Sequence, residues 1–166
     1  MSEISSFKES VEKMIELSNE KFGDRLNASL NLKVLDCDEK ERKWIDYRYD
    51  AVELHKNPYG CIHGGMACTL FDTCAGIAGT VICGKFLSTT DLSVSFIKPM
   101  SSSFFRIHVD YNLVAHKMIG AEARIFSGET DELCALGMIK YLKRSQDHIK
   151  TRIILHGSLF RYPIQM

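Results

Sequence analysis

The chain has 166 residues, which is the length of one domain with a sizeable buried core. Its 21 basic and 21 acidic side chains cancel, so no positive field indicates nucleic-acid binding and no acidic excess indicates disorder. The hydrophobic fraction of 45% and the charged fraction of 25% are typical of a soluble globular protein.

Residues 3–22 predict an amphipathic helix, because apolar side chains recur at steps of three and four residues. Ser6 followed by Glu9 fits a capping box at the start of this helix, and Gly23 fits its end. The same segment has several charged residues and no apolar core of a signal peptide. We therefore expect a cytoplasmic protein.

Six cysteines occur without a C-x-x-C pair or the spacing of a zinc finger. This pattern indicates reduced thiols in a cytosolic protein, where free cysteine behaves as a small hydrophobe. Cys61 and His63 could form half of a metal site, but no second pair of ligands stands out. We expect no metal ion.

Two alternating segments, 30–36 and 43–50, predict strands joined by a charged turn. A loop over residues 51–62 then leads into an apolar run over residues 65–83. That run is long enough to cross a membrane, but Asp72 at its centre and its glycines favour a buried helix of a soluble protein.

Alternation with a period of two follows the apolar run. It predicts four successive antiparallel strands in a meander, over residues 89–98, 104–115, 118–126 and 132–142. The order of elements predicts an α+β fold in which a curved antiparallel sheet wraps around one long buried helix. Because that helix is apolar on nearly every face, we expect the sheet and a partner subunit to cover it together.

The start of the buried helix and its one charged side chain are the candidates for chemistry. Gly64 and Gly65 have no side chains and so expose backbone N–H groups that can stabilise a developing negative charge. Asp72 is the only charged side chain in the apolar run, and a buried carboxylate is costly unless it is paired or used. A helix end of this kind with a helix carboxylate indicates acyl-transfer chemistry.

Two segments of the chain resemble the hotdog-fold thioesterases. They are Asn57-x5-His63-Gly64-Gly65-x6-Asp72, and Thr89-Thr90-Asp91-Leu92-Ser93-Val94 followed by Phe96-x2-Pro99. Their order and spacing are similar to the PaaI-like (phenylacetate-degradation) branch of the 4-hydroxybenzoyl-CoA thioesterase superfamily. The resemblance extends over residues 28–143, which is most of the chain.

This resemblance implies an acyl-CoA thioesterase with no cofactor, since coenzyme A is part of the substrate. It implies that the Gly64 N–H polarises the thioester carbonyl and that Asp72 acts as general base on water or as nucleophile. Asn57 would orient water or substrate, and the Thr89 hydroxyl would lie near the attacking water. Two structural interpretations compete with these roles. Asn57 could be only a turn residue, and Asp72 could be a structural carboxylate that is hydrogen-bonded to Thr69 or Thr73.

Four further residues are implied as substrate contacts. The Lys117 side chain, in the turn after residue 114, would bind the phosphates of coenzyme A, although His116 stands where relatives often have Gly. His63 either contacts substrate or supports the loop. The other contacts are Gly65 and Phe96, the latter in an acyl pocket with Met66 and Leu70.

Gly64 and Asp72 are eight residues apart, which is about 12 Å along a helix. One carbonyl group cannot contact both within a single chain. Two antiparallel helices related by a two-fold axis would bring them together, so the motif predicts a homodimer with two composite sites. The resemblance further implies a homotetramer, and we expect no nucleic-acid or membrane partner.

The sequence divides into an N-terminal helix (1–25), a hotdog thioesterase domain (26–144) and a C-terminal extension (145–166) that contains one more alternating piece, Ile149–Leu155. Two alternatives to a thioesterase stay open. A hotdog enoyl-CoA hydratase needs Asp and His five residues apart, as Asp50 and His55 are, but with Asn-Pro between them, which is missing. The second alternative is a non-catalytic module that binds acyl-CoA.

Overall fold

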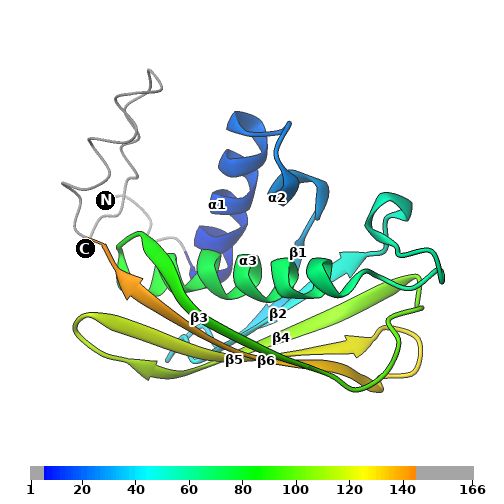
Figure 1. The fold of residues 1–166 in the computed structure, drawn as a ribbon. Coiled ribbons are helices and arrows are strands. Elements are labelled where there is room, and N and C mark those ends of the chain that lie inside the picture. The colour runs from blue at the N-terminus through cyan, green and yellow to red at the C-terminus, as the bar shows by residue number, and fades with distance from the viewer. Residues whose placement is uncertain (1–5, 145–166) are drawn as a thin grey trace.

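A six-stranded antiparallel sheet curves around one long helix in the computed structural model, which describes residues 6–144 (Figure 1). The predicted α+β hotdog fold is confirmed. In chain order the elements are α1 (Phe7–Lys21), α2 (Leu26–Ser29), β1 (Lys33–Cys37), β2 (Trp44–Asp50), the 3-10 helix η1 (Glu53–His55), α3 (Gly64–Cys83), β3 (Leu87–Phe96), β4 (Phe104–Val114), β5 (Met118–Ser127) and β6 (Leu133–Lys143).

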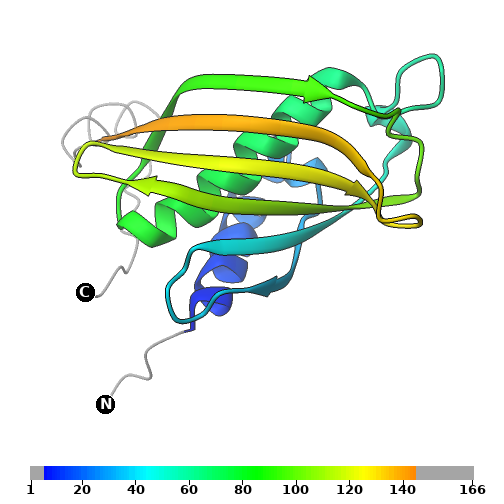
Figure 2. The same cartoon turned by 90° about the horizontal axis from the view of Figure 1, so that it is seen from below.

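The strand order in the sheet is β1-β2-β4-β5-β6-β3. The prediction of a four-strand meander is therefore wrong, because β3 pairs with β6 and not with its successor β4. Residues 97–103 carry the chain across the ends of β6 and β5 before β4 begins (Figure 2). Only β4, β5 and β6 follow one another as neighbours. β3 forms an edge of the sheet.

α3 lies against the concave face of the sheet, with α1 on its other side (Figure 1). By length and composition α3 could cross a membrane, but its position identifies it as the core helix. Phe71 packs so closely on β6 that a Cβ added to Gly137 would lie 2.8 Å from its ring. α3 ends at Gly84, whose positive φ of 60° suits glycine.

The N-terminal helix supplies part of the cover that we expected from a partner subunit. α1 buries Phe7, Val11 and Ile15 and contacts α3 and β1. Its predicted capping box is present, since Ser6 Oγ accepts from the Glu9 N–H at 3.1 Å and the Glu9 carboxylate accepts from the Ser6 N–H at 3.0 Å. The short helix α2 was not predicted.

Three buried tyrosines fasten α3 to the sheet. The hydroxyls of Tyr47 on β2, Tyr111 on β4 and Tyr141 on β6 donate hydrogen bonds to backbone carbonyls of α3 at 3.0, 2.7 and 2.8 Å. The three accepting carbonyls belong to Cys74, Ala75 and Asp72, in that order. Each hydrogen bond of this kind stabilises a fold by about 1 kcal/mol.

Residues 145–166, which include the predicted alternating piece Ile149–Leu155, lie outside the described part of the chain. The proposed division at residues 25 and 144 stays a prediction.

Candidate active site

His63 caps the start of α3. Its ring Nδ1 accepts a hydrogen bond from the Gly65 N–H at 3.0 Å. Its carbonyl accepts from the N–H groups of Met66 and Ala67 at 2.8 and 3.2 Å. Of the first four N–H groups of the helix, that of Gly64 alone has no acceptor within residues 6–144. His63 therefore caps the helix through Nδ1, and the Gly64 N–H is a backbone donor without an acceptor among the described residues.

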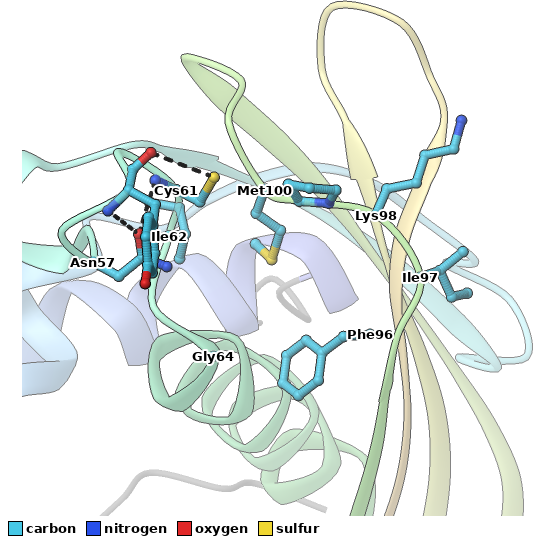
Figure 3. A pocket seen from close by; sticks show the side chains of 10 residues that line it. Asn57, Cys61, Ile62, Gly64, Phe96, Ile97, Lys98 and Met100 are labelled. Carbon is cyan, nitrogen blue, oxygen red and sulfur yellow. Dashed lines mark hydrogen bonds between the residues drawn. The ribbon is translucent and has the colours of Figure 1, made fainter.

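A pocket of about 560 Å³ opens beside Gly64 (Figure 3). The ring of Phe96, at the end of β3, points at Gly64, and a Cβ added to Gly64 would lie 3.2 Å from it. Most of the lining is apolar, which suits an apolar ligand group. The other lining residues are Asn57, Tyr59, Cys61, Ile62, Ile97, Lys98, Pro99 and Met100.

Asn57 holds the loop that forms one wall of this pocket. Its side-chain Oδ1 accepts hydrogen bonds from the backbone N–H groups of Tyr59 and Cys61 at 2.9 and 3.3 Å. Its own N–H donates to the Cys61 carbonyl at 2.7 Å. Asn57 therefore does act as a turn residue, because an asparagine side chain can accept from the backbone two residues further on. Since Oδ1 is occupied, any contact from Asn57 to water or substrate falls to its Nδ2 group.

Asp72 lies on α3 beside the edge strand β3 and is half-buried. The Thr89 hydroxyl donates a hydrogen bond to Asp72 Oδ1 at 2.7 Å. The hydroxyl of the next residue, Thr90, donates to the Lys140 carbonyl at 3.1 Å across a bulge in β3 and not to Asp72. Thr69, one of the alternative partners for Asp72, donates to the Gly65 carbonyl at 3.0 Å.

Tyr141 is the residue of this region that the sequence analysis missed. Its hydroxyl donates to the Asp72 backbone carbonyl at 2.8 Å. Burial, and then the Asp72 carboxylate, raise the pKa of Tyr141 far above its usual range, so the hydroxyl remains a donor. The signal that could have found it is the glycine four residues after Asp72, because Gly76 leaves that carbonyl uncovered.

The predicted residues thus form two half-sites. The helix-start half-site contains Asn57, Gly64 and Phe96, and the carboxylate half-site contains Asp72 and Thr89. Asp72 is not among the residues that line the pocket. Gly64 and Asp72, the helix residues of the two half-sites, are eight positions apart on α3.

Lys117 lies at the end of the sheet opposite the pocket. The next residue, Met118, pairs with Leu142 near the end of β6, whereas Phe96 pairs with Ala135 near its start. The Lys117 carbonyl accepts from the Lys143 N–H at 2.9 Å, which joins the β4–β5 turn to the end of β6.

Four cationic residues lie at this end of the sheet, which we call the basic end. The Arg144 N–H donates to the Phe86 carbonyl at 2.8 Å, which brings the residues after α3 to the same place. None of the four has a carboxylate partner in the part of the chain that the structure describes. By contrast Lys98, at the pocket, forms an ion pair with Glu132. The basic end consists of Lys85, Lys117, Lys143 and Arg144.

Some candidate residues lie elsewhere. Leu70 is wholly buried and Met66 packs on the core, so neither lines the pocket as proposed for the acyl group. The hydratase pair gains no support either. Asp50 forms ion pairs with Lys33 and Arg48. His55 is buried, with its two ring nitrogens bonded to the hydroxyls of Ser29 and Tyr49, and burial lowers the pKa of His55.

Several solved structures with the same fold carry the name thioesterase. Thioesterase superfamily member 2 from Mus musculus superposes with a TM-score of 0.69 at 18% identity, covering 84% of this chain and 98% of that one. The zebrafish thioesterase superfamily member 2 gives a TM-score of 0.70 at 16% identity, covering 85% and 100%. A thioesterase from Haemophilus influenzae, classed EC 3.1.2.-, gives 0.66 at 19% identity, covering 77% and 88%. The protein therefore has the hotdog fold of thioesterases.

A family model matches the middle of the chain. Residues 59–134, which contain α3 and strands β3 to β5, match the model of the Thioesterase superfamily. This segment, 76 of the 166 residues, is therefore similar to that superfamily. No curated protein sequence matches the chain significantly. Membership of the PaaI-like branch is compatible with these findings and stays a prediction.

Proposed function

We propose that this protein is an acyl-CoA thioesterase, which hydrolyses an acyl-CoA to a free acid and coenzyme A at sites shared by two subunits. The observation that supports this most is the hydrogen bond between Thr89 on β3 and Asp72 on α3. Asp72 is on the same helix as the free Gly64 N–H, eight positions along the chain from it. A carboxylate and an oxyanion donor are the two groups that hydrolysis of a thioester requires.

In the proposed reaction the Gly64 N–H stabilises the negative charge that develops on the thioester oxygen. Asp72 either takes a proton from the attacking water or attacks the carbonyl carbon itself. In either route the carbon–sulfur bond then breaks, and the thiolate leaves and is protonated to coenzyme A. Where Asp72 attacks directly, water then hydrolyses the mixed anhydride, which releases the acid and restores the carboxylate. A donor of this type is typically worth about 10²–10³ in rate, and a general base about 10²–10⁴.

The free edge of β3 supports a dimer in which the two half-sites combine. β3 pairs only with β6 in the described chain, so its other edge is available. Two copies of β3 related by a two-fold axis would pair antiparallel, placing the Phe96 end of one beside the Leu87 end of the other. Asp72 of the partner subunit would then approach the pocket beside Gly64. Further pairing of dimers into a homotetramer belongs to the same proposal.

The distribution of charge supports coenzyme A as the thioester carrier. The pocket beside Gly64 is mostly apolar, and its one lysine is already paired with Glu132. The basic end of the partner subunit, with Lys117, would lie beside this pocket in the same antiparallel dimer. Unpaired cations suit the phosphates of coenzyme A, and an apolar pocket suits the acyl group. A cytoplasmic location belongs to the same proposal.

The experiment that tests the proposal is thiol release from a panel of acyl-CoAs (phenylacetyl, hydroxybenzoyl, short, medium and long chain), with Asp72→Asn as the comparison. We expect kcat to fall by about two orders of magnitude or more in the variant, while the dimer stays intact. The same acyl groups on N-acetylcysteamine, which has no phosphates, test the carrier, and we expect a higher KM for them.

Two results would reject this function. Equal rates for the wild type and Asp72→Asn would remove Asp72 from the chemistry. Tight binding of an acyl-CoA without thiol release would instead identify a non-catalytic binding module, the second reading of the fold.

A further inference from the structure

We infer that Tyr141 is a positioning residue for Asp72 and acts together with Thr89. The inference rests on the proposed function, in which Asp72 performs the chemistry. Thr89 and Tyr141 are directly opposite each other on the paired strands β3 and β6. Thr89 donates to the Asp72 carboxylate at 2.7 Å, and Tyr141 donates to the Asp72 backbone carbonyl at 2.8 Å. One cross-strand pair therefore holds both the side chain and the backbone of one residue.

Small residues in α3 make this contact accessible. In a helix, the carbonyl of residue i points toward residue i+4, whose side chain normally covers it. The three carbonyls that accept from tyrosines belong to Asp72, Cys74 and Ala75. Four positions after each of these comes a small residue, namely Gly76, Ala78 and Gly79. A Cβ added to Gly76 would lie 3.6 Å from the Tyr141 hydroxyl. That separation is ordinary van der Waals contact, so a small residue at position 76, up to the size of alanine, leaves room for the bond.

Directional bonds fix the rotation of the helix in a way that apolar packing does not. A shift of α3 by one residue would turn it by about 100° and move it by about 1.5 Å. That movement would break the tyrosine bonds and take the Asp72 carboxylate away from Thr89. Tyr141 is the one of the three tyrosines whose bond ends on Asp72 itself.

The other two tyrosines provide matched controls. Tyr47 and Tyr111 are also buried and also donate to carbonyls of α3, but those carbonyls belong to Cys74 and Ala75. Each of the variants Tyr141→Phe, Tyr47→Phe and Tyr111→Phe removes one buried hydroxyl and nothing else. We expect similar decreases in melting temperature for all three, because the lost bond is of the same kind.

The three variants should differ in kcat. We expect Tyr141→Phe to lower kcat about 10- to 100-fold with KM changed less than about twofold, since a small misplacement of a reacting group has effects of this size. Tyr47→Phe and Tyr111→Phe should keep kcat within about twofold of the wild type. Equal losses of kcat in the three variants would overturn the inference, because the tyrosines would then be general anchors of the helix.

A second readout does not depend on activity. The ¹³C resonance of the Asp72 side-chain carboxyl should move in Tyr141→Phe and stay in place in Tyr47→Phe. If the wild type hydrolyses none of the thioesters, the proposed function fails, and this resonance still decides the inference: no movement in Tyr141→Phe would overturn it. Should Tyr141→Phe not fold, Thr89→Val tests the other bond to Asp72, with Thr89→Ser, which keeps the hydroxyl, expected to retain the wild-type resonance.

Discussion

At the scale of the residue, His63 and Gly64 have different tasks at the start of α3. His63 uses its ring to cap the helix, through the Gly65 N–H. Gly64 is left with a free N–H at the mouth of the pocket. A histidine next to a reaction centre is often taken for a general base, but here its Nδ1 is already occupied by the backbone. The free donor is a backbone group, which a side-chain substitution alone cannot remove.

Proline can remove that donor. The first position of a helix tolerates proline, and His63 has φ −61° and ψ 137°, which suit a residue before proline. We predict that Gly64→Pro lowers kcat by about 10²–10³, the usual effect of losing an oxyanion donor. Steady-state thiol release checks this, with circular dichroism to confirm the fold.

The control for that experiment is Gly64→Ala, which keeps the N–H. Both substitutions place a carbon about 3.2 Å from the exposed ring of Phe96. We expect Gly64→Ala to retain most of the activity, so an equal loss in the two variants would point to Phe96 and away from the N–H group.

Asn57, Gly64 and Asp72 could be chosen as candidate site residues from the sequence, because they fall in one short segment. Their roles depend on contacts that the motif does not encode. The bond from Tyr141 to Asp72 joins residues 69 positions apart. Neither alternation nor local spacing can predict such a contact. The capping by His63 and the occupied Oδ1 of Asn57 likewise became clear only from the structure.

At the scale of the element, the outer face of the sheet has a charged cross-strand pair that the mechanism does not use. His108 on β4 is directly opposite Asp46 on β2. Its Nδ1 lies 2.8 Å from Asp46 and its Nε2 3.1 Å from Asp110. The hydrogen bond that His108 donates to the Asp46 carboxylate, aided by the charges of both carboxylates, raises the pKa of His108. Protonated His108 therefore helps to join β2 to β4.

This pair gives stability a defined dependence on pH. Because the pKa of His108 is raised in the folded state, its contribution is fully present below the unfolded value of about 6.5 and is lost as pH rises through the folded value. We predict that the free energy of unfolding decreases between pH 6 and pH 9 by about 1 kcal/mol or less from this residue, given its partial exposure to solvent.

Urea denaturation at several pH values measures that decrease. His108→Gln should flatten the slope, whereas His116→Gln, which changes an exposed histidine in the β4–β5 turn, should not. An unchanged slope in His108→Gln would contradict the prediction.

The strands were predictable from the sequence and their order was not. Alternating apolar residues mark the side chains that face α3, which is why each of the six strands was found near its observed position. Alternation gives the buried face of a strand but not its neighbour. The pairing of β3 with β6 depends on residues 97–103 crossing two strand ends. The four-residue helix α2 is too short to show a helical period.

At the scale of the whole molecule, the composite site can be tested by mixing two inactive variants. Gly64→Pro damages the helix-start half-site and Asp72→Asn damages the carboxylate half-site. In a mixed dimer one of the two sites receives an intact half from each subunit. Random exchange of subunits should therefore restore about a quarter of the wild-type activity, since about half of the dimers are mixed and each has one intact site of two.

Denaturing and refolding the two variants together provides the mixed dimers, and size-exclusion chromatography confirms their mass. Refolding each variant alone is the control and should restore nothing. No gain of activity on mixing, with dimers present, would show that each site lies within one chain. A monomer at micromolar concentration would reject the composite site directly.

The position of β3 and β6 in the sheet also bears on how the protein is made. α3 is complete when Cys83 has been added, but β6, which covers it, ends only at Lys143. At about 5–20 residues per second, the ribosome needs about 3–12 s to add the 60 residues between them. During that time a 20-residue helix with the length and hydropathy of a membrane span lacks part of its cover. Each newly made chain therefore passes through an interval of seconds in which its most apolar segment is open to chaperones.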